Sequence, residues 1–312
     1  MKNIICVGEM VIDFFPGCED GIYIRKAGGA PANVAVAAAR NRISAGFCGR
    51  MGNDDFGRFL VNTLKKNEVA ILCPQLVDEA MTTMTFVTLG ADGSRSFTFA
   101  RKPGADMFLN REDIDKAKVS EADMIHAGSC SLSKDPAADA TVYAIETAKK
   151  NGKLVSFDVN YRNLMWDNNR NACKEAVHRV FPNVDFLKIS EEEADMLDGT
   201  LEETAKKYDI SVIVESLGAK GARCCFGGEI ITVPGKEAKC VDATGAGDAF
   251  WGNFLSYLLR NRVKSTADLS VTLLKRALEY GNLAGWFCVQ KKGAMESLPT
   301  AEELDSILEV KT

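Results

Sequence analysis

Short apolar segments alternate with amphipathic segments along most of this chain, and this alternation limits the fold more than any other feature. Runs of four or five apolar residues indicate buried strands, and apolar residues spaced three or four apart indicate helices. Their alternation predicts an α/β fold in which helices cover both faces of a mostly parallel sheet. The predicted strands are 4–8, 45–49, 124–128, 154–158, 186–190 and 212–216, and the predicted helices are 31–41, 54–67, 141–150, 171–181 and 191–197.

One region departs from this alternation. Residues 83–89 and 94–99 have the pattern of two strands, and Gly90-Ala91-Asp92-Gly93 between them has the composition of a hairpin turn. Residues 14–26, which contain Pro16, Gly17 and Gly21, are expected to join the same flap. We therefore expect a single domain over 1–312, with a flap of about 14–26 and 83–101 inserted in its α/β core.

Composition excludes several classes of protein. The chain has 43 acidic and 38 basic residues and a net charge of −5, which argues against a nucleic-acid partner. No apolar run is long enough to cross a membrane. The ten cysteines are scattered without a Cys-x-x-Cys pair, and the first residues read as a strand rather than a secretion signal, so we expect a cytoplasmic protein. The two histidines are too few for a multi-histidine metal site.

Residues 242–250 form the most distinctive polar segment. They read Asp-Ala-Thr-Gly-Ala-Gly-Asp-Ala-Phe, follow a polar stretch with strand character, and open an amphipathic helix. Gly245, Ala246 and Gly247 let the backbone approach a ligand closely, and the free N–H groups of a helix start bind anions. No Lys-Ser/Thr follows, so this is not a Walker motif, and Phe250 occupies the last glycine position of Gly-x-Gly-x-x-Gly. The segment predicts an anion-binding loop of another type.

Asp248 lies in the first turn of the helix that this loop opens. Acids at that place often do no more than favour the helix N-terminus. Beside a phosphate-binding loop, however, a carboxylate would repel phosphate unless it accepted the proton of a hydroxyl nucleophile. The glycine loop before it favours this second interpretation, in which Asp248 is a general base.

Further polar residues follow glycines or predicted strands near the N-terminus. Gly28 and Gly29 precede an Ala-rich helix whose first turn carries Asn33, which can bond a sugar hydroxyl. A plain loop-to-helix junction explains the same pattern equally well. Asp13 comes shortly after the first strand, where ligands bind in open α/β sheets, and is either a hydroxyl ligand or a solvated acid.

Three later strands are followed by polar residues, and each of these groups has two possible interpretations. Arg162 is either a phosphate ligand or a surface ion-pair partner. Residues 188–193 carry a carboxylate that could organise Mg²⁺ waters, although Ser190 and Glu193 also have the spacing of a capping box. Residues 216–221 form a turn bracketed by glycines. This turn either binds the phosphate or ribose of a nucleotide or has no role beyond reversing the chain.

In this order along the chain, the segments resemble the ribokinase-like sugar kinases of the PfkB carbohydrate kinase family. Residues 28–33 are similar to the family's N-terminal motif and residues 242–248 to its C-terminal motif, and the resemblance covers nearly the whole chain. It implies a Rossmann-type three-layer sandwich with a small β-sheet lid, which corresponds to the predicted flap. In many relatives two lids pair, so the resemblance also implies a homodimer.

The resemblance implies a role for each candidate residue. Asp248 would be the base, and the anion hole would comprise Gly245, Ala246 and Gly247. The sugar would be held by Asp13, Gly29 and Asn33, with help from Arg101 of the lid and from Arg162. The site for ATP and its Mg²⁺ would comprise Lys188, Ser190, Glu193, Ser216, Gly218, Gly221 and Asn282. A monovalent cation, usually K⁺, would lie near Asp242, Thr244, Gly293 and Ser297. Many relatives have Asn in place of Ser190, so the chain departs from the family pattern at that position.

Within the family, several stretches resemble bacterial fructokinases: residues 8–13, 28–33, 52–57, 82–87, 101–106 and 160–166. The implied reaction is ATP-dependent phosphorylation of a primary hydroxyl, with O6 of D-fructose as the expected acceptor. Kinases of 2-keto-3-deoxygluconate, aminoimidazole riboside or another ketose share much of this pattern and remain alternatives. A sugar sensor without activity is disfavoured because Asp248 and the glycine loop are intact. A nicotinamide-dependent oxidoreductase is disfavoured by the missing glycine fingerprint.

Overall fold

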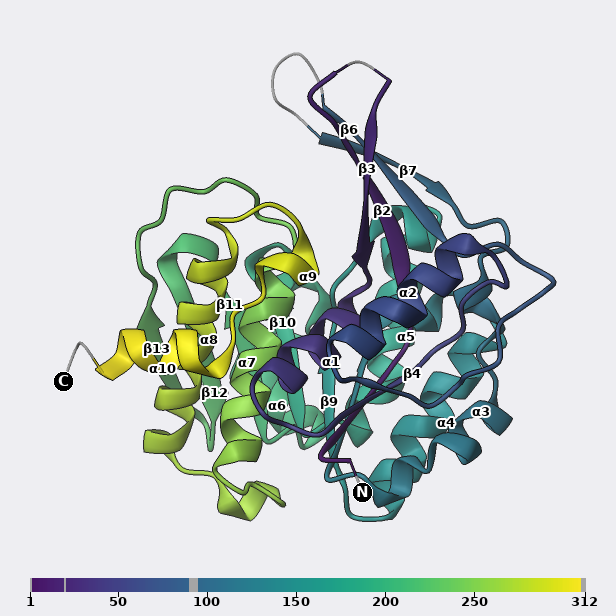
Figure 1. The fold of residues 1–312 in the computed structure, drawn as a ribbon. Helices are drawn as coiled ribbons and strands as arrows, with labels where there is room; N and C mark the ends of the chain where they lie inside the picture. The colour runs from purple at the N-terminus through teal and green to yellow at the C-terminus, as the bar shows by residue number, and fades with distance from the viewer. Residues whose placement is uncertain (1, 20, 90–94, 310–312) are drawn as a thin grey trace.

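Two β-sheets organise the computed structural model, which describes residues 2–19, 21–89 and 95–309 (Figure 1). Among these residues, nine strands form the larger sheet in the order β13-β12-β11-β10-β9-β8-β1-β4-β5. Neighbouring strands from β5 to β11 run parallel, and β12 and β13 continue the sheet antiparallel. These strands are β1 (Ile4–Val7), β4 (Ala45–Cys48), β5 (Ala70–Ile71), β8 (Met124–Gly128), β9 (Leu154–Asp158), β10 (Phe186–Ser190), β11 (Val212–Ser216), β12 (Gly221–Phe226) and β13 (Glu229–Pro234).

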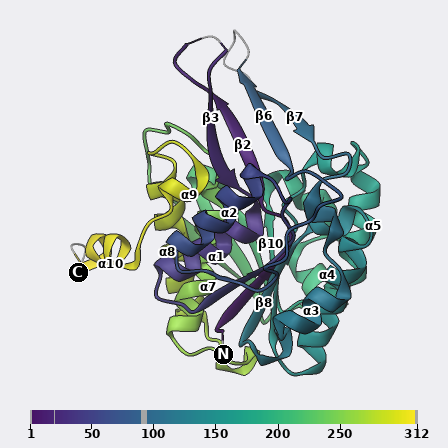
Figure 2. The same ribbon diagram turned by 45° about the vertical axis from the view of Figure 1, so that its right-hand side comes forward.

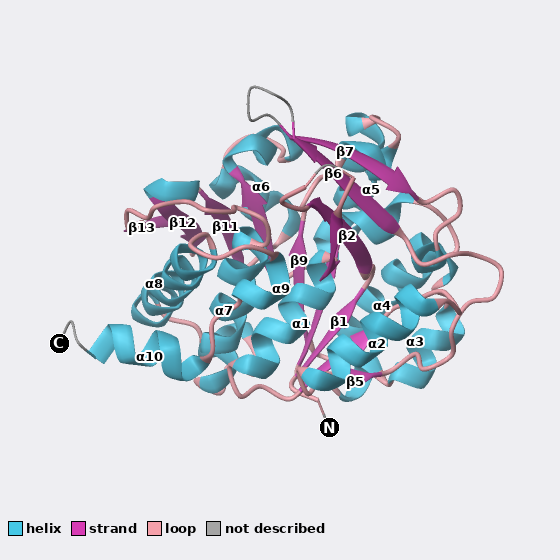
Figure 3. Ribbon diagram, turned by 45° about the horizontal axis from the view of Figure 1, so that its top comes forward, coloured by secondary structure: helices cyan, strands magenta, loops and turns pink. Residues whose placement is uncertain are grey.

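Helices cover both faces of this sheet, as the alternation predicts (Figure 3). In β1, Ile4 and Cys6 point into one hydrophobic core, whereas Ile5 and Val7 point into the other, because successive strand residues face opposite sides. The first core packs against α1 (Ala30–Arg40), α2 (Asp55–Lys66), α7 (Ala246–Arg260), α8 (Val271–Cys288), α9 (Ala294–Ser297) and α10 (Ala301–Glu309). The second packs against α3 (Arg111–Ala117), α4 (Ala137–Lys150), α5 (Arg170–Val180) and α6 (Leu201–Tyr208).

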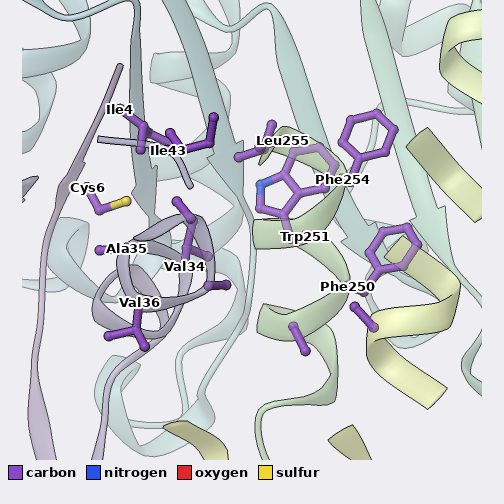
Figure 4. Close-up of a cluster of buried hydrophobic side chains, with 14 of the residues drawn as sticks. Ile4, Cys6, Val34, Ala35, Val36, Ile43, Phe250, Trp251, Phe254 and Leu255 are labelled. Atoms are coloured by element: carbon purple, nitrogen blue, oxygen red, sulfur yellow. The ribbon is translucent and has the colours of Figure 1, made fainter. Parts of the chain in front are cut away.

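Helix α7 is more deeply buried than its sequence pattern predicts. We expected an amphipathic helix, but α7 lies between α1 and α8, and its residues from Asp248 to Leu259 are buried except Tyr257. Trp251 is fully buried and stacks on Phe254 at 4.9 Å between ring centroids (Figure 4). Its Nε1 donates to Ser156 Oγ at 3.0 Å. This packing fixes the helix whose first turn carries Asp248.

The second sheet projects from the body of the molecule (Figure 2). Its strands are ordered β3 (Tyr23–Gly28), β2 (Val11–Pro16), β6 (Met84–Leu89) and β7 (Arg95–Ala100). Phe14 of β2 stacks on Phe86 of β6 and meets Phe56 of α2 edge-on, which anchors the sheet to the body. The expected flap segments thus lie in one sheet, and the expected turn at Gly90 to Gly93 lies outside the described residues.

One sequence expectation is refined and one is wrong. A helix is predicted at 191–197, and Glu191–Met196 is a 3₁₀ helix, at whose start Glu193 Oε2 accepts the Ser190 N–H at 2.8 Å. The stretch before Asp242 was expected to have strand character. It is irregular, because Val241 donates its N–H to Val289 O at the end of α8 and pairs with no strand. Within the described part of the chain, no helix is long and apolar enough to span a membrane.

Candidate active site

Two adjoining cavities collect most of the candidate residues. The larger, of about 800 Å³, lies between the second sheet and the body, and the candidates that line it are Asp13, Gly29, Asn33, Arg162, Lys188, Thr244, Gly245, Gly247 and Asp248. The smaller, of about 320 Å³, is lined by the candidates Ser216, Gly218, Gly221, Ala246, Gly247 and Asn282. Ala243 and Gly247 line both. The glycine loop is therefore the boundary between the two cavities.

Asp248 is held by a residue of the other motif. Asn33, in the first turn of α1, donates from Nδ2 to Asp248 Oδ2 at 2.6 Å, and both side chains are buried. The Oδ1 of Asn33 is buried without a hydrogen-bond partner in the structure. Because a carboxylate has a second oxygen, the bond with Asn33 orients Asp248 and leaves Oδ1 able to accept a proton. Both side chains lie in the wall of the larger cavity.

The glycine loop has the backbone that an anion site needs. Gly245 adopts φ +78° as the N-cap of α7, and a Cβ there would lie 2.8 Å from Ala294 Cβ. Only glycine combines this left-handed conformation with such close packing. Ala246 donates its N–H to Ala243 O at 3.2 Å, and Gly247, the next residue of this 15-residue helix, lines both cavities at the place where the helix dipole favours negative charge.

A buried ion pair adds positive charge beside this loop. Lys188 Nζ lies 2.8 Å from Asp158 Oδ2, and both side chains are almost fully buried. Burial opposes the lysine charge, but Asp158, Glu193 and Asp248 outweigh it and raise the pKa of Lys188. Burial also raises the pKa of Asp158 to about 6, although Lys188 acts in the opposite direction. The Lys188 ammonium lies 3.7 Å from the place where a Cβ of Gly247 would be. It is therefore positioned to meet an anion bound by the loop.

Asp13 supplies a further carboxylate in the lining of the larger cavity. Burial raises its pKa to about 6, against the lowering effects of a Thr85 hydrogen bond and the Arg162 charge. A Cβ on Gly28 would lie 2.1 Å from Asp13 Oδ2, so the absence of a side chain at Gly28 makes room for this carboxylate. A carboxylate oxygen exposed to the cavity accepts hydroxyl hydrogen bonds.

Sequence analysis missed Glu9, which also lines the larger cavity. Its side chain is 4% exposed, its Oε2 has no hydrogen-bond partner, and burial raises its pKa to about 7. The signal was available: Glu9 comes two residues after the end of β1, at the strand end where ligands bind.

Not every candidate reaches the cavities. Arg101 pairs with Asp106, with 2.7 Å between Nη2 and Oδ2, and it lines neither cavity. Ser190 and Glu193 also lie outside the two linings. Both Glu193 oxygens accept backbone N–H groups, one from Ser190 at 2.8 Å and one from Tyr161 at 2.5 Å. The capping-box interpretation of Glu193 therefore matches its contacts.

The residues expected to surround a monovalent cation do lie together. Asp242 Oδ1 accepts from Thr244 N at 3.0 Å and from Thr244 Oγ1 at 2.7 Å, and its Oδ2 accepts from Gly293 N at 3.0 Å. Ser297 Oγ donates to Gly293 O at 2.5 Å. In the described part of the chain, no cluster of three or more His, Cys, Asp or Glu side chains has the arrangement of a metal site.

Comparison with known proteins agrees with this geometry. The model of the pfkB family carbohydrate kinases matches residues 1–301. The chain belongs to the pfkB carbohydrate kinase family. It is 36% identical to fructokinase-2 of Zea mays, over 98% of this chain and 93% of the relative. As a member of this family the chain is a phosphotransferase with an alcohol acceptor.

Solved structures of relatives have the same fold. A fructokinase of Xylella fastidiosa with bound ATP superposes with a TM-score of 0.90 at 28% identity, covering 100% of this chain and 99% of the other. A fructokinase double mutant of Vibrio cholerae, with fructose, ADP and potassium bound, gives a TM-score of 0.87 at 34% identity, covering 99% and 98%. The predicted ribokinase-like α/β fold with a second small sheet is confirmed.

Proposed function

We propose that this kinase transfers the γ-phosphoryl group of ATP to O6 of D-fructose, giving fructose 6-phosphate and ADP. The observation that carries the proposal is the place of Asp248 and Gly247, at the boundary between a larger and a smaller cavity. A sugar in the larger cavity and a nucleotide in the smaller would meet there. Fructokinases with fructose and ADP or with ATP bound share this fold, which supports the choice of both substrates.

In the proposed mechanism, Asp13, Gly29 and Asn33 orient the sugar in the larger cavity. Asp248, held by Asn33, accepts the proton of the primary hydroxyl as its oxygen attacks the γ-phosphorus. The N–H groups of residues 245–247 and the Lys188 ammonium stabilise the charge on the transferred group. Arg162, an exposed side chain that lines the larger cavity, is proposed to bind sugar or phosphate oxygens. Arg101 is proposed to support the wall of this cavity through its ion pair with Asp106. Ser216, Gly218, Gly221 and Asn282 are proposed to flank ATP in the smaller cavity.

Two metal ions fit the residues present. Mg²⁺ binds mainly to phosphate oxygens and water in such sites, and needs few protein ligands. Glu192, an exposed acid that lines the larger cavity, is the carboxylate suited to its water shell, in place of the internally bonded Glu193. Bound Mg²⁺ would neutralise phosphate charge. Carboxylate and carbonyl oxygens around Asp242 and Gly293 are of the kind that hold K⁺, which would add positive charge behind the glycine loop.

The second sheet is proposed to be both a lid and a dimer interface. As a lid it would exclude water from the larger cavity and limit ATP hydrolysis. At its edge, Tyr23 and Ile24 of β3 are about half exposed, as is the neighbouring Ile22. A row of exposed apolar side chains on an edge strand suits pairing with a second copy. Ten free cysteines, eight of them buried, support a reducing location such as the cytoplasm.

The test is ADP release measured with Mg·ATP and K⁺ on fructose, 2-keto-3-deoxygluconate, ribose, aminoimidazole riboside and tagatose. We expect a kcat/KM for fructose at least tenfold above that of every other acceptor. Phosphorus NMR of the product should identify the 6-phosphate. A higher kcat/KM with another acceptor would contradict fructose as the substrate, and no ADP release with any acceptor would contradict the proposed activity.

A further inference from the structure

Trp286 is an aromatic wall of the smaller cavity that the mechanism above does not use. It lies near the end of α8, lines the cavity, and donates from Nε1 to Glu237 O at 2.8 Å. This bond fixes the indole against the irregular segment 235–241. The chain has three tryptophans, and the other two, Trp166 and Trp251, are buried at 7% and 0% exposure. Trp286 is therefore the tryptophan that a ligand in this cavity can touch.

One face of the indole is covered by a cation. Lys236 Nζ lies 3.6 Å from the centroid of a Trp286 ring, and Lys236 itself lines the same cavity. That distance equals the spacing of a stacked aromatic ligand. A flat ligand on this face and the Lys236 ammonium would therefore exclude one another. The lysine is exposed, so moving it into water costs little.

Asn282 lies one turn earlier on α8, four residues before Trp286, so both side chains share one face of the helix. Its Nδ2 donates to Val233 O at 3.2 Å and to Pro234 O at 3.3 Å. These bonds commit the amide nitrogen to β13, and the Oδ1 can only accept hydrogen bonds. The cavity thus offers an aromatic face together with an acceptor that can bond the amino edge of a base.

We propose that Trp286 is the stacking surface for the nucleotide base, and that Lys236 covers this surface until the base displaces it. This inference rests on the proposed function, since it assumes that the nucleotide binds in the smaller cavity. It assigns nucleotide affinity to an aromatic face outside the glycine loop. Sugar binding, which takes place in the larger cavity, is independent of it.

The test is calorimetric titration of ADP, together with tryptophan fluorescence, on the whole protein. Replacing Trp286→Ala should weaken ADP binding about 10- to 100-fold, the range of base–aromatic stacking, without changing the KM for fructose. Trp286→Phe should keep ADP affinity within about threefold and abolish the ADP-dependent fluorescence change. Lys236→Ala should tighten ADP binding about two- to fivefold, because the competing cation–π contact is gone.

The neighbouring pair Phe287 and Lys291 provides the matched control. Lys291 Nζ lies 4.0 Å from the Phe287 ring, and neither residue lines the cavity. Phe287→Ala and Lys291→Ala should leave ADP affinity unchanged. Unchanged ADP binding in Trp286→Ala would overturn the stacking role, and weaker binding in Lys236→Ala would overturn its competition with the base. If the unmodified protein bound no ADP, the proposed function would fail instead.

Discussion

Asn33 Nδ2 lies 2.6 Å from Asp248 Oδ2, in a buried contact that joins residues 215 positions apart in the chain. Each residue lies in the first turn of its helix, Asn33 in α1 and Asp248 in α7, and the two helices pack against each other. The contact unites the two motifs that sequence analysis identified separately. It also sets the orientation of the proposed base, so its removal should affect the reaction more than the fold.

We predict that Asn33→Ala lowers kcat about 10- to 100-fold, because a hydrogen bond to a charged group contributes roughly 1.5–3 kcal/mol. Asn253→Ala is the matched control. Asn253 is a fully buried residue of α7 that accepts from Asn41 Nδ2 at 2.6 Å and lines neither cavity. It should lower Tm and leave kcat unchanged. Steady-state kinetics and thermal unfolding of both variants check this, and equal kcat values would refute the orienting role.

Glu9 should make the protein less stable as the pH rises. Burial raises the pKa of Glu9 from 4.5 to about 7 in the folded protein, so between these values the unfolded chain releases the proton first. The free-energy penalty for holding an ionised Glu9 in the folded protein is therefore absent below pH 4.5 and complete above pH 7. We predict that Glu9→Gln raises the free energy of unfolding by roughly 1–3 kcal/mol at pH 8 and by much less at pH 5.

Denaturant unfolding at the two pH values measures this effect. Glu215→Gln is the control, since Glu215 is equally buried but pairs with Arg223, and its variant should be less stable at both pH values. A Glu9→Gln variant that is destabilised at pH 8 would show that the carboxylate is needed by the free protein.

Gly28→Ala should impair sugar binding selectively. The new Cβ would lie 2.1 Å from Asp13 Oδ2 and force that carboxylate out of place. We predict that KM for fructose rises about tenfold or more, because the sugar loses one hydrogen bond to a charged group. The KM for ATP should be unchanged. Gly128→Ala, where the nearest atom is 3.4 Å away, should leave both constants unchanged. A normal KM for fructose in Gly28→Ala would argue against Asp13 as a sugar ligand.

The proposed dimer predicts a change of mass with one substitution on the second sheet. Ile24 is 47% exposed on β3, and Ile24→Lys would place charge on that strand. We expect sedimentation velocity to give a dimer for the unmodified protein and a monomer for the variant. Ile230→Lys, at a 40% exposed position of β13, should remain dimeric. A monomeric unmodified protein would exclude the interface.

The sequence predicted the layers of the fold because they depend on local periodicity. Runs such as Ile4–Val7 are apolar on both faces, and only a sheet covered on both sides hides all four residues. Periodicity did not reveal the burial of α7, because that depends on which helices pack against it. The 3₁₀ form of the turn after Ser190 was not predictable either, because a capping box like that of Ser190 and Glu193 also opens the α-helix α6.

The site was predictable where a residue type and a strand or helix end coincide. Asp248 and Asn33 stand at helix starts next to glycines, and each was identified for that reason. The capping box predicted the bond of Glu193 with the Ser190 N–H. The partners Asp106 of Arg101 and Tyr161 of Glu193 were not predictable, because they are known only from the folded chain. Glu9 was predictable as a candidate from its place after β1, but its burial was not, because that depends on elements that are far away in sequence.

The most direct test of the central claim is the turnover of Asp248→Asn with fructose and Mg·ATP. The amide has the size of the carboxylate and can still contact Asn33, but it cannot accept the hydroxyl proton. We predict that kcat falls about 10²- to 10⁴-fold, the contribution of a general base, while calorimetry shows unchanged binding of fructose and ADP. Turnover close to that of the unmodified protein would contradict the role of Asp248 and the mechanism built on it.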